Sequence, residues 1–443
     1  MKRIFYLLLI ALCAACGNDD SFSASSGLQL SFSMDTLKMD TVFSNIPSST
    51  YAFWVHNNND AGLKLQTVRL KRGNQTGFRV NVDGVYLDNS NGSQTSNVEI
   101  RRKDSILVFV ELTAATTQQQ APKLVEDDLL FSLESGREQK VNLRAWAWDA
   151  VKMYSPVIEK DTEIASEQPI VIYGDMTVKE GVTLTLRNAQ LYFHDSSGLE
   201  VYGTLQAENC LMRGDRLDHM FDYLPYDRVS GQWAGIHFYK SSTANTLQGT
   251  EIRSANEGIV CDSAAISENA YRLRMEHCIV HNSLNSNISA TNARLLLDHC
   301  QLSNAGGDCL AVFGGNVTLR YCTLAQFYPY SAQRGDALYF TNRWGKKSLP
   351  LKLSCEGCIV TGYADDVLTG EDTGDGTDFL YHFNNCLLRT PEVKESADFI
   401  DILWETPKDE AGGKKHFVTI DETNFIYNFH LVETSPAKGL GCY

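Results

Sequence analysis

The residues best suited to chemistry lie between Arg213 and Val229, a stretch rich in charged and aromatic side chains. Its candidate catalytic residues are Asp215, Asp218 and His219, and the candidate binding residues in and just after it are Tyr223, Tyr226 and Trp233. A pair of carboxyl groups with a histidine can transfer protons to and from a sugar, while tyrosine rings stack on it. The same composition is also typical of an ordered flap held by ion pairs. The sequence leaves both interpretations open.

A second group begins in the stretch from Phe327 to Asp336 and continues into a basic, aromatic patch. We take Arg334 as a further catalytic candidate, and Tyr328, Arg343 and Trp344 as candidate binding residues. Cationic groups beside aromatic rings would complement an acidic glycan, because opposite charges attract. The alternative is a solvated turn without a ligand.

A third group is acidic. Asp372, Asp375 and Asp378 lie close together in a glycine-rich stretch. Ca²⁺ takes six or more oxygen ligands, so closely spaced carboxylates on a loop are candidate ligands for it. Their spacing does not match the EF-hand loop. No other cofactor is indicated by the sequence.

An internal repeat must position these groups, which fall on insertions between its units. Leu273, Met275 and Cys278 recur as Leu295, Leu297 and Cys300, and again as Val317, Leu319 and Cys322, with a period of 22 residues. A fixed period of this length is typical of a solenoid, whose units bury their apolar faces by stacking. Apolar residues at alternate positions indicate strands, and the two polar residues before each cysteine indicate a corner. Further short strands carry Ile236, Ile259, Leu310, Leu338 and Val367, often just after Gly or Asp.

This repeat predicts that residues 150–443 form a right-handed parallel β-helix. Residues 28–149 show another pattern, with roughly seven short alternating runs separated by Asn, Gly and Asp, which is typical of an immunoglobulin-like β-sandwich. We therefore expect an all-β chain, in which an amino-terminal immunoglobulin-like β-sandwich is followed by a right-handed parallel β-helix.

The cysteines follow the same repeat. Six of them occupy one corner of successive units, where other units have Ala189 or Thr250; they are Cys210, Cys278, Cys300, Cys322, Cys358 and Cys386. A small, buried, apolar residue suits that corner, and a free thiol meets the requirement. Cys355 and Cys358 have the spacing of half a zinc site but also fall on core positions of the repeat. We therefore expect most of these thiols to be reduced and unreactive in the native protein.

The first sixteen residues have the features of a targeting signal. A basic start and an apolar run from Ile4 to Leu12, too short to span a membrane, precede Ala14, Ala15 and Cys16. This arrangement resembles the bacterial lipobox, with Cys13 where Leu is usual. The resemblance implies a signal peptide over residues 1–15, lipidation of Cys16 and a flexible tether over residues 16–27. It also implies a lipid-anchored protein of the outer membrane, exposed at the cell surface.

The charge of the chain limits its partners. The formal net charge is −15, which argues against nucleic acid, because phosphate binding needs a basic face. We expect a polysaccharide or another envelope component as the partner, and contact with the membrane through the lipid alone.

The whole chain resembles surface lipoproteins of Bacteroidetes that join a sandwich to a pectate-lyase-like β-helix. Its most recognisable stretch runs from Arg213 to Tyr223, followed by Gly231, Gln232, Trp233, Gly235 and Ile236. The resemblance implies the fold and the location but no reaction. The sequence lacks the Gly-x-Ser-x-Gly and His-Glu-x-x-His motifs, so we favour a surface protein whose loops bind a glycan or envelope partner. The alternative is a polysaccharide lyase or glycoside hydrolase acting on one face of the β-helix.

Overall fold

The computed structural model describes residues 21–219, 225–405 and 412–443. They divide into two compact units: one holds the residues up to Asp149 together with Leu217–His219, and the other holds Ala150–Arg216 and the residues from Pro225 onward. The described residues contain only three short helical turns, η1 (Asn89–Asn91), η2 (Tyr226–Arg228) and η3 (Gly412–His416). No helix in this part of the chain is long and apolar enough to cross a membrane.

The first unit consists of two five-stranded sheets around one apolar core. The first sheet has the order β1 (Ser31–Phe32), β3 (Tyr51–His56), β8 (Ser105–Leu112), β5 (Phe78–Val82) and β6 (Val85–Tyr86). The second has the order β2 (Thr36–Phe43), β10 (Glu138–Trp148), β9 (Lys123–Leu133), β4 (Leu63–Leu70) and β7 (Gln94–Ile100). Pairing is antiparallel except between β2 and β10, which run parallel. Phe53 and Phe131 meet edge to face in the core, with ring centroids 6.5 Å apart.

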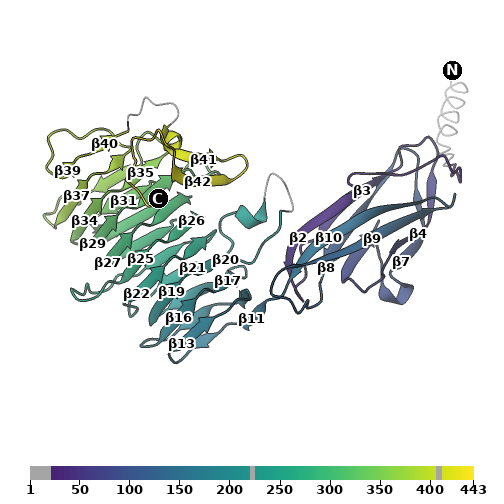
Figure 1. The fold of residues 1–443 in the computed structure, drawn as a ribbon, viewed down its shortest axis with the longest axis horizontal. Helices are drawn as coiled ribbons and strands as arrows, with labels where there is room; N and C mark the ends of the chain where they lie inside the picture. The colour runs from purple at the N-terminus through teal and green to yellow at the C-terminus, as the bar shows by residue number, and fades with distance from the viewer. Residues whose placement is uncertain (1–20, 220–224, 406–411) are drawn as a thin grey trace, which may run out of the picture. The chain divides into compact units, whose positions relative to one another are not determined.

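The second unit is a solenoid of parallel strands, in agreement with the predicted β-helix (Figure 1). One sheet has eleven strands in the order β11 (Val151–Tyr154), β14 (Ile170–Tyr173), β17 (Gln190–Phe193), β20 (Leu211–Gly214), β23 (Glu251–Arg253), β26 (Ile279–Ser283), β28 (Gln301–Ala305), β30 (Thr323–Gln326), β35 (Ile359–Gly362), β38 (Leu387–Leu388) and β40 (Leu403–Trp404). We call it the eleven-stranded sheet.

The other large sheet follows the remaining two sides of each coil. Its seventeen strands are β12 (Val157–Ile158), β13 (Thr162–Ala165), β15 (Met176–Val178), β16 (Thr183–Arg187), β18 (Gly198–Val201), β19 (Thr204–Glu208), β21 (Gly235–Phe238), β22 (Asn245–Gln248), β24 (Ile259–Cys261), β25 (Leu273–Glu276), β27 (Ile288–Asp298), β29 (Leu310–Arg320), β31 (Leu338–Thr341), β34 (Leu351–Glu356), β36 (Leu368–Glu371), β37 (Phe379–Asn384) and β39 (Phe399–Ile400). Two hairpins complete the unit: β32 (Arg343–Trp344) with β33 (Lys347–Ser348), and β41 (Phe417–Asp421) with β42 (Ile426–Leu431).

The 22-residue period is one coil of this solenoid. Leu273 pairs with Leu295, Leu295 with Val317, and Val317 with Leu353 on successive parallel strands. Residues that share a position in the repeat therefore lie directly above one another. Stacking buries them: Leu273, Leu295 and Val317 are at most 1% exposed.

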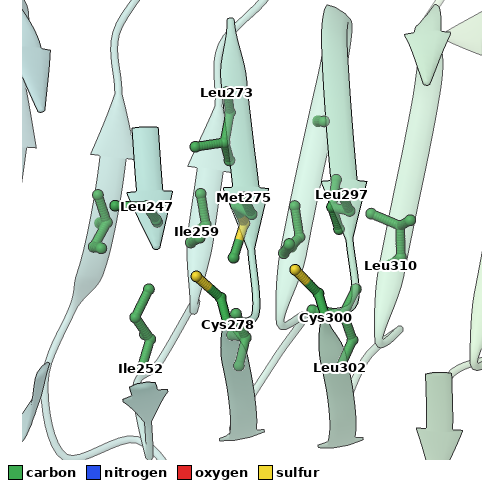
Figure 2. Close-up of a cluster of buried hydrophobic side chains, with 14 of the residues drawn as sticks. Leu247, Ile252, Ile259, Leu273, Met275, Cys278, Leu297, Cys300, Leu302 and Leu310 are labelled. Carbon is green, nitrogen blue, oxygen red and sulfur yellow. The ribbon is translucent and has the colours of Figure 1, made fainter. Parts of the chain in front are cut away.

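The cysteine corner has a defined backbone geometry. His277, His299 and Tyr321 adopt positive φ angles of 50°, 50° and 47°, which turns the chain sharply between the two sheets. The next residue in each coil is a buried cysteine, whose thiol donates to the carbonyl oxygen two residues earlier at 3.3 Å. The Thr250 hydroxyl makes the equivalent bond to Gln248 at 3.1 Å. Figure 2 shows Cys278 and Cys300 at this corner among leucine and isoleucine side chains.

The carboxyl-terminal segment covers part of the eleven-stranded sheet from outside. Phe417 on β41 and Phe429 on β42 pack against outward-facing residues of that sheet in a separate apolar cluster; its buried members are Ala325, Phe327, Ile359, Leu387, Phe417, Phe429, Ala437 and Leu440. We call the β41–β42 hairpin with its flanking residues the carboxyl-terminal cap.

Buried charges tie this cap to the solenoid. The Glu405 carboxylate accepts from the Thr361 hydroxyl at 2.6 Å and lies 3.1 Å from Nε2 of His416 and 3.7 Å from Nη1 of Arg389. Burial alone would raise the pKa of Glu405, but hydrogen bonds from His416 and Thr361 hold it below its usual value. A carboxylate that is both buried and paired loses several interactions at once when its charge is removed.

We expect the native thiols to resist modification. The described cysteines are free, and all are buried except Cys442, which is half-buried. Burial raises the pKa of the Cys261 and Cys442 thiols to about 12, and the reactive species is the thiolate. A thiol reagent should therefore label no more than Cys442 before unfolding and all of these cysteines afterwards, as counted by intact-protein mass spectrometry. Rapid labelling of Cys278 or Cys300 in the folded protein would contradict the buried corner.

Replacing Glu405 should weaken the anchoring of the cap. Glu405→Gln removes the charge that Arg389 and His416 face, and we expect it to lower the free energy of unfolding of the second unit by about 3–5 kcal/mol. Glu356→Gln, a change at an exposed carboxylate, serves as the control and should alter it by less than about 0.5 kcal/mol. Urea unfolding of both variants measures the difference. Equal effects would show that the buried charges do not hold the cap.

Candidate functional site

Five consecutive coils place a polar residue at one equivalent position just before a strand of the seventeen-stranded sheet, and four of these residues are carboxylates. Leu310 pairs with Leu338, and Leu338 pairs with Leu368, in the parallel seventeen-stranded sheet. Asp308, Asp336 and Asp366 each lie two residues before these leucines, so they occupy equivalent positions one coil apart. Two coils earlier, Glu257 has the same relation to Ile259, and Ser286 fills the position between Glu257 and Asp308. We call Glu257, Asp308, Asp336 and Asp366 the carboxylate row.

Hydrogen bonds link neighbouring members of the row. Glu257 Oε2 accepts from the backbone N–H of Ser286 at 3.3 Å, and Ser286 Oγ accepts from the backbone N–H of Asp308 at 3.3 Å. Asp308 Oδ1 accepts from the backbone N–H of Asp336 at 2.7 Å. This last approach needs a glycine, because a Cβ atom at Gly335 would lie only 2.4 Å from Asp308 Oδ1. The carboxylate of one coil is thus fixed by the backbone of the next.

The electrostatics of the row favour protonation. Burial raises the pKa of Asp308 to about 6, and the charge of Asp336 adds to the effect, while the hydrogen bond from the backbone of Asp336 opposes it. Burial also raises the pKa of Asp336 and of Glu257. A carboxyl group with a pKa near neutrality can donate or accept a proton at physiological pH, and such shifts are common at functional sites.

Aromatic side chains lie on the outer face of the same strands. Tyr339 on β31 donates its hydroxyl to Glu371 Oε2 at 2.8 Å; burial raises its pKa to about 12, and Glu371 and, to a smaller extent, the charge of Asp308 add to the effect. Phe313 on β29 lies 5.8 Å from the Tyr339 ring and 5.0 Å from the Trp344 ring, between ring centroids. Trp344 is 45% exposed. The face thus combines carboxyl groups with an accessible aromatic surface, which suits a sugar ring.

A pocket opens beside Asp336. It encloses about 370 Å³ and is lined by Arg334, Asp336 and Tyr363, among other residues. The Arg334 guanidinium lies 4.8 Å from the centre of the Tyr363 ring, and its Nη1 donates to the carbonyl oxygen of Tyr328 at 2.8 Å. Of the four candidate catalytic residues from the sequence, Arg334 is the one that the structure places next to the carboxylate row.

A histidine lies on the same face, several coils away. His237 on β21 is related to Val260, Ser289, Ala311 and Tyr339 by successive pairings. Its Nε2 lies 2.9 Å from Asp262 Oδ1, and its Nδ1 lies 3.9 Å from Glu200 Oε2. The face therefore carries a second group of proton-transferring side chains, which the sequence did not single out.

The other three catalytic candidates do not join the row. Asp215 Oδ2 lies 2.7 Å from Nδ1 of His194, and burial raises its pKa. Asp218 and His219 belong to the first unit, where Asp218 is buried and the backbone N–H of His219 donates to Asp40 Oδ2 at 2.8 Å. Catalysis by these residues would require them to converge on one groove, but Asp218 and His219 belong to a different unit from Asp215 and Arg334.

Several candidate binding residues prove to be structural. Trp233 is 1% exposed, stacks on Phe193 with centroids 4.5 Å apart and belongs to the solenoid core, so its assignment to a binding surface is wrong. Tyr328 is 2% exposed, and its hydroxyl lies 2.6 Å from Ser230 Oγ. Its assignment to a binding surface is therefore also wrong. Tyr226 is half-buried beneath the Arg216 guanidinium at 4.0 Å. Tyr223 lies outside the described residues.

The basic and aromatic patch does reach the surface. Arg343 and Trp344 form one strand of the β32–β33 hairpin, and both are exposed. Because Trp344 also contacts Phe313, the hairpin is held beside the outer face that carries the carboxylate row. These two residues remain candidates for ligand binding.

The predicted calcium ligands serve another purpose. Asp372 Oδ1 accepts from Asn342 Nδ2 at 2.9 Å and from the backbone N–H of Gly374 at 3.0 Å. Asp375 accepts from the hydroxyl groups of Ser348 and Thr373 and from the backbone N–H of Thr377. Among the described residues, no group of three His, Cys, Asp or Glu side chains could hold a metal ion, so Asp372, Asp375 and Asp378 do not form the expected site. The two aspartates that have these partners act as hydrogen-bond acceptors within their turns.

A signal for the row is present in the sequence. Gly-Asp precedes Cys309-Leu310 and again precedes Ala337-Leu338, and Asp-Asp precedes Val367-Leu368. The alternation of the repeat marks the leucines as strand residues. Aligning the coils on these leucines, rather than on the cysteines alone, brings the three aspartates into one column.

Comparison with known proteins gives no family. No protein-family model matches the chain, and no curated protein matches its sequence. Among solved structures the chain is similar to a family 123 glycoside hydrolase from Clostridium perfringens, with a TM-score of 0.20 and 5% identity over 29% of this chain and 30% of that one, so it spans under a third of that protein. It is also similar to the Agl-KA catalytic domain, with a TM-score of 0.26 and 9% identity over 80% of this chain and 76% of that one. For the catalytic domain of a GH87 α-1,3-glucanase in complex with nigerose, the TM-score is 0.20 and the identity 9% over 77% and 82% of the two chains. Similarity at these TM-scores supports no conclusion about the activity of this chain.

Proposed function

We propose that the chain acts on a glycan beside the carboxylate row, along the outer face of β29, β31 and β36, and that Asp308 and Asp336 hydrolyse a glycosidic bond there. The observation that supports this best is the raised pKa of Asp308, about 6, next to a second carboxylate one coil away. Glycoside hydrolysis needs one carboxyl group that is protonated near neutral pH and a second that is ionised.

The two residues would have different roles. Protonated Asp308 donates its proton to the glycosidic oxygen as the C–O bond breaks, and ionised Asp336 attacks the anomeric carbon. Water then displaces Asp336 and returns a proton to Asp308, which leaves a new reducing end. Adjacent coils lie about 4.8 Å apart, close to the carboxyl separation of about 5–5.5 Å in retaining glycosidases. The mutual repulsion of the two carboxylates favours the state in which they share one proton.

The aromatic groups would bind the sugar. Tyr339 lies three residues after Asp336, and the exposed Trp344 ring contacts Phe313, which also contacts Tyr339. Stacking of a sugar ring on an aromatic face buries apolar C–H surface while leaving the hydroxyl groups free to form hydrogen bonds. Arg334, beside Asp336, can contact the hydroxyl groups of the substrate.

The second candidate function is glycan binding without a reaction. It is favoured by the hydrogen bond that Asp308 accepts from the backbone of Asp336, because a carboxylate used in this way also stabilises the stacking of two coils. Under this function the exposed loops, including Arg343 and Trp344, hold the ligand. The two candidates differ in whether reducing ends appear.

The location proposed from the sequence accords with such a role. We propose a lipoprotein of the outer membrane, anchored through Cys16 and exposed at the cell surface, whose tether and immunoglobulin-like first unit present a right-handed parallel β-helix to an extracellular polysaccharide. Residues 1–20, including Cys16, lie outside the described residues. The basis for this location is the amino-terminal sequence alone.

Removing either carboxylate should abolish hydrolysis. We expect Asp308→Asn and Asp336→Asn each to lower the rate of reducing-end release by about 10²–10⁴-fold, the usual contribution of an acid or base catalyst. Wild-type activity should fall as the pH rises above about 6, because Asp308 must be protonated. The assay uses a panel of neutral and acidic polysaccharides, with Glu356→Gln as the control. Equal rates in all variants would exclude the row as the site, whereas glycan binding without reducing ends would select the second candidate.

The Asp308→Asn substitution should also stabilise the folded protein at high pH. The pKa of Asp308 rises from 3.8 to about 6 on folding, so the folded state binds the proton more tightly and loses stability as the pH rises through this range. Asparagine keeps the hydrogen bond from Asp336 and has no charge to bury. Asp308→Asn should therefore raise the Tm by a few degrees at about pH 8 and by much less at about pH 4. A lower Tm at both pH values would indicate a purely structural carboxylate.

A further inference from the structure

A larger pocket lies on another side of the solenoid and has no part in the proposed reaction. It opens over the outer face of β23, β26 and β28, next to β42, and encloses about 660 Å³. Ligand pockets are typically about 300–1,000 Å³. We call it the hairpin pocket; its lining includes Asp227, Arg228, Glu251, Arg253, His281, Gln301, Tyr330, Tyr427, His430 and Tyr443.

Polar side chains form the floor of the hairpin pocket. Glu251 and Arg253 alternate along β23, so both face outward, and Arg253 Nη1 lies 3.4 Å from Glu251 Oε1. His281 pairs with Arg253 on the next strand, and Gln301 continues the row of Glu251 two strands away. The register of the solenoid therefore brings four hydrogen-bonding side chains to one place.

Two of the polar groups in the lining are buried and have no hydrogen-bond partner within the described part of the chain. They are Nε of Arg253 and the hydroxyl group of Tyr427. A buried polar atom without a partner costs about 1–3 kcal/mol, so native proteins retain few of them. The Arg253 atom belongs to the floor of the pocket, and the Tyr427 hydroxyl belongs to the β41–β42 hairpin. A ligand with hydroxyl groups in the pocket could satisfy both.

The charges of the pocket are balanced within it. Arg253 is paired with Glu251, and Arg228 Nε lies 3.8 Å from Asp227 Oδ2. Burial and the charge of Arg253 lower the pKa of His281 to about 3, so its ring is neutral, and its Nδ1 lies 2.8 Å from Ser303 Oγ. A charged ligand would meet no uncompensated opposite charge among these groups. A neutral ligand suits them better.

Aromatic rings form the walls. Tyr427 packs edge-on against His281 at 5.5 Å, and Tyr330 stacks on Phe425 at 5.1 Å. The Tyr443 hydroxyl donates to Gln301 Oε1 at 2.7 Å, which fixes the ring at the opposite side. Rings held in this way lose little conformational entropy when a ligand binds.

We infer that the hairpin pocket binds a neutral oligosaccharide, as a second sugar site separate from the carboxylate row. Its paired charges disfavour a strongly acidic ligand, and its rings provide stacking surfaces. The Arg253 Nε–H group can donate a hydrogen bond to a sugar hydroxyl group, and the Tyr427 hydroxyl can donate or accept one. The pocket does not depend on hydrolysis at Asp308. It would hold a glycan to the solenoid whether or not the row is catalytic.

Calorimetric titration of the full chain with neutral oligosaccharides tests this inference. The probes are gluco-, manno-, galacto- and xylo-oligosaccharides of three to six units, with oligogalacturonate as the acidic comparison. Tyr427→Phe removes one hydroxyl group and preserves the ring, so we expect about tenfold weaker binding of the neutral ligand. Arg253→Gln should weaken it by a similar factor. Tyr271→Phe, on another side of the solenoid beneath Arg294, is the matched control and should leave the affinity unchanged.

Hydrogen exchange on the wild-type chain provides a measurement that needs no variant. A bound neutral oligosaccharide should slow exchange of the amides of β42 and β26 and leave those around Asp308 unchanged. Asp308→Asn should retain this binding, so that failure of the proposed hydrolysis and failure of the pocket are distinguishable. Binding that is equal in Tyr427→Phe and wild type, binding of oligogalacturonate only, or no binding of any neutral probe would overturn the inference.

Discussion

Everything in the second unit depends on the parallel, in-register stacking of its coils. Backbone hydrogen bonds between coils fix the register, and the corner fixes where each coil turns. His277, His299 and Tyr321 take positive φ angles there, and the following cysteine thiol donates to a carbonyl oxygen that also accepts from a backbone N–H of the neighbouring coil. A side chain at this position must be small enough for the core, as Ala189 is, and where it can donate, as Thr250 can, it makes the same hydrogen bond as the cysteines.

The same register creates the two candidate sites. Asp308 and Asp336 are close because they hold equivalent positions on neighbouring coils, and Gly335 removes the Cβ atom that would separate them. Glu251, Arg253 and His281 come together on the eleven-stranded sheet for the same reason. The carboxyl-terminal cap then adds Tyr427 to that face, held by the buried charges around Glu405. The side chains of each candidate site are thus brought together by the repeated register of the coils.

The solenoid could be predicted from the sequence because alternating apolar residues and a fixed period reflect burial directly. The cysteine corner followed from the same pattern. The sites could not be found in this way: Trp233 and Tyr328 have the composition of a binding surface, yet tertiary packing buries both. Asp308 was overlooked because a single aspartate before a strand has no signature until neighbouring coils are aligned. His281 and Tyr427 are far apart in sequence and meet only through the folding of the cap, which no local pattern encodes.

The unequal sequence intervals within the carboxylate row have a structural consequence. Asp308, Asp336 and Asp366 are one coil apart in space, although insertions of different length separate them along the chain. Segments such as the β32–β33 hairpin loop outward without disturbing the coil above or below. Changes in the length or sequence of these excursions can therefore be accommodated at the surface while the positions of the three aspartates relative to one another stay the same.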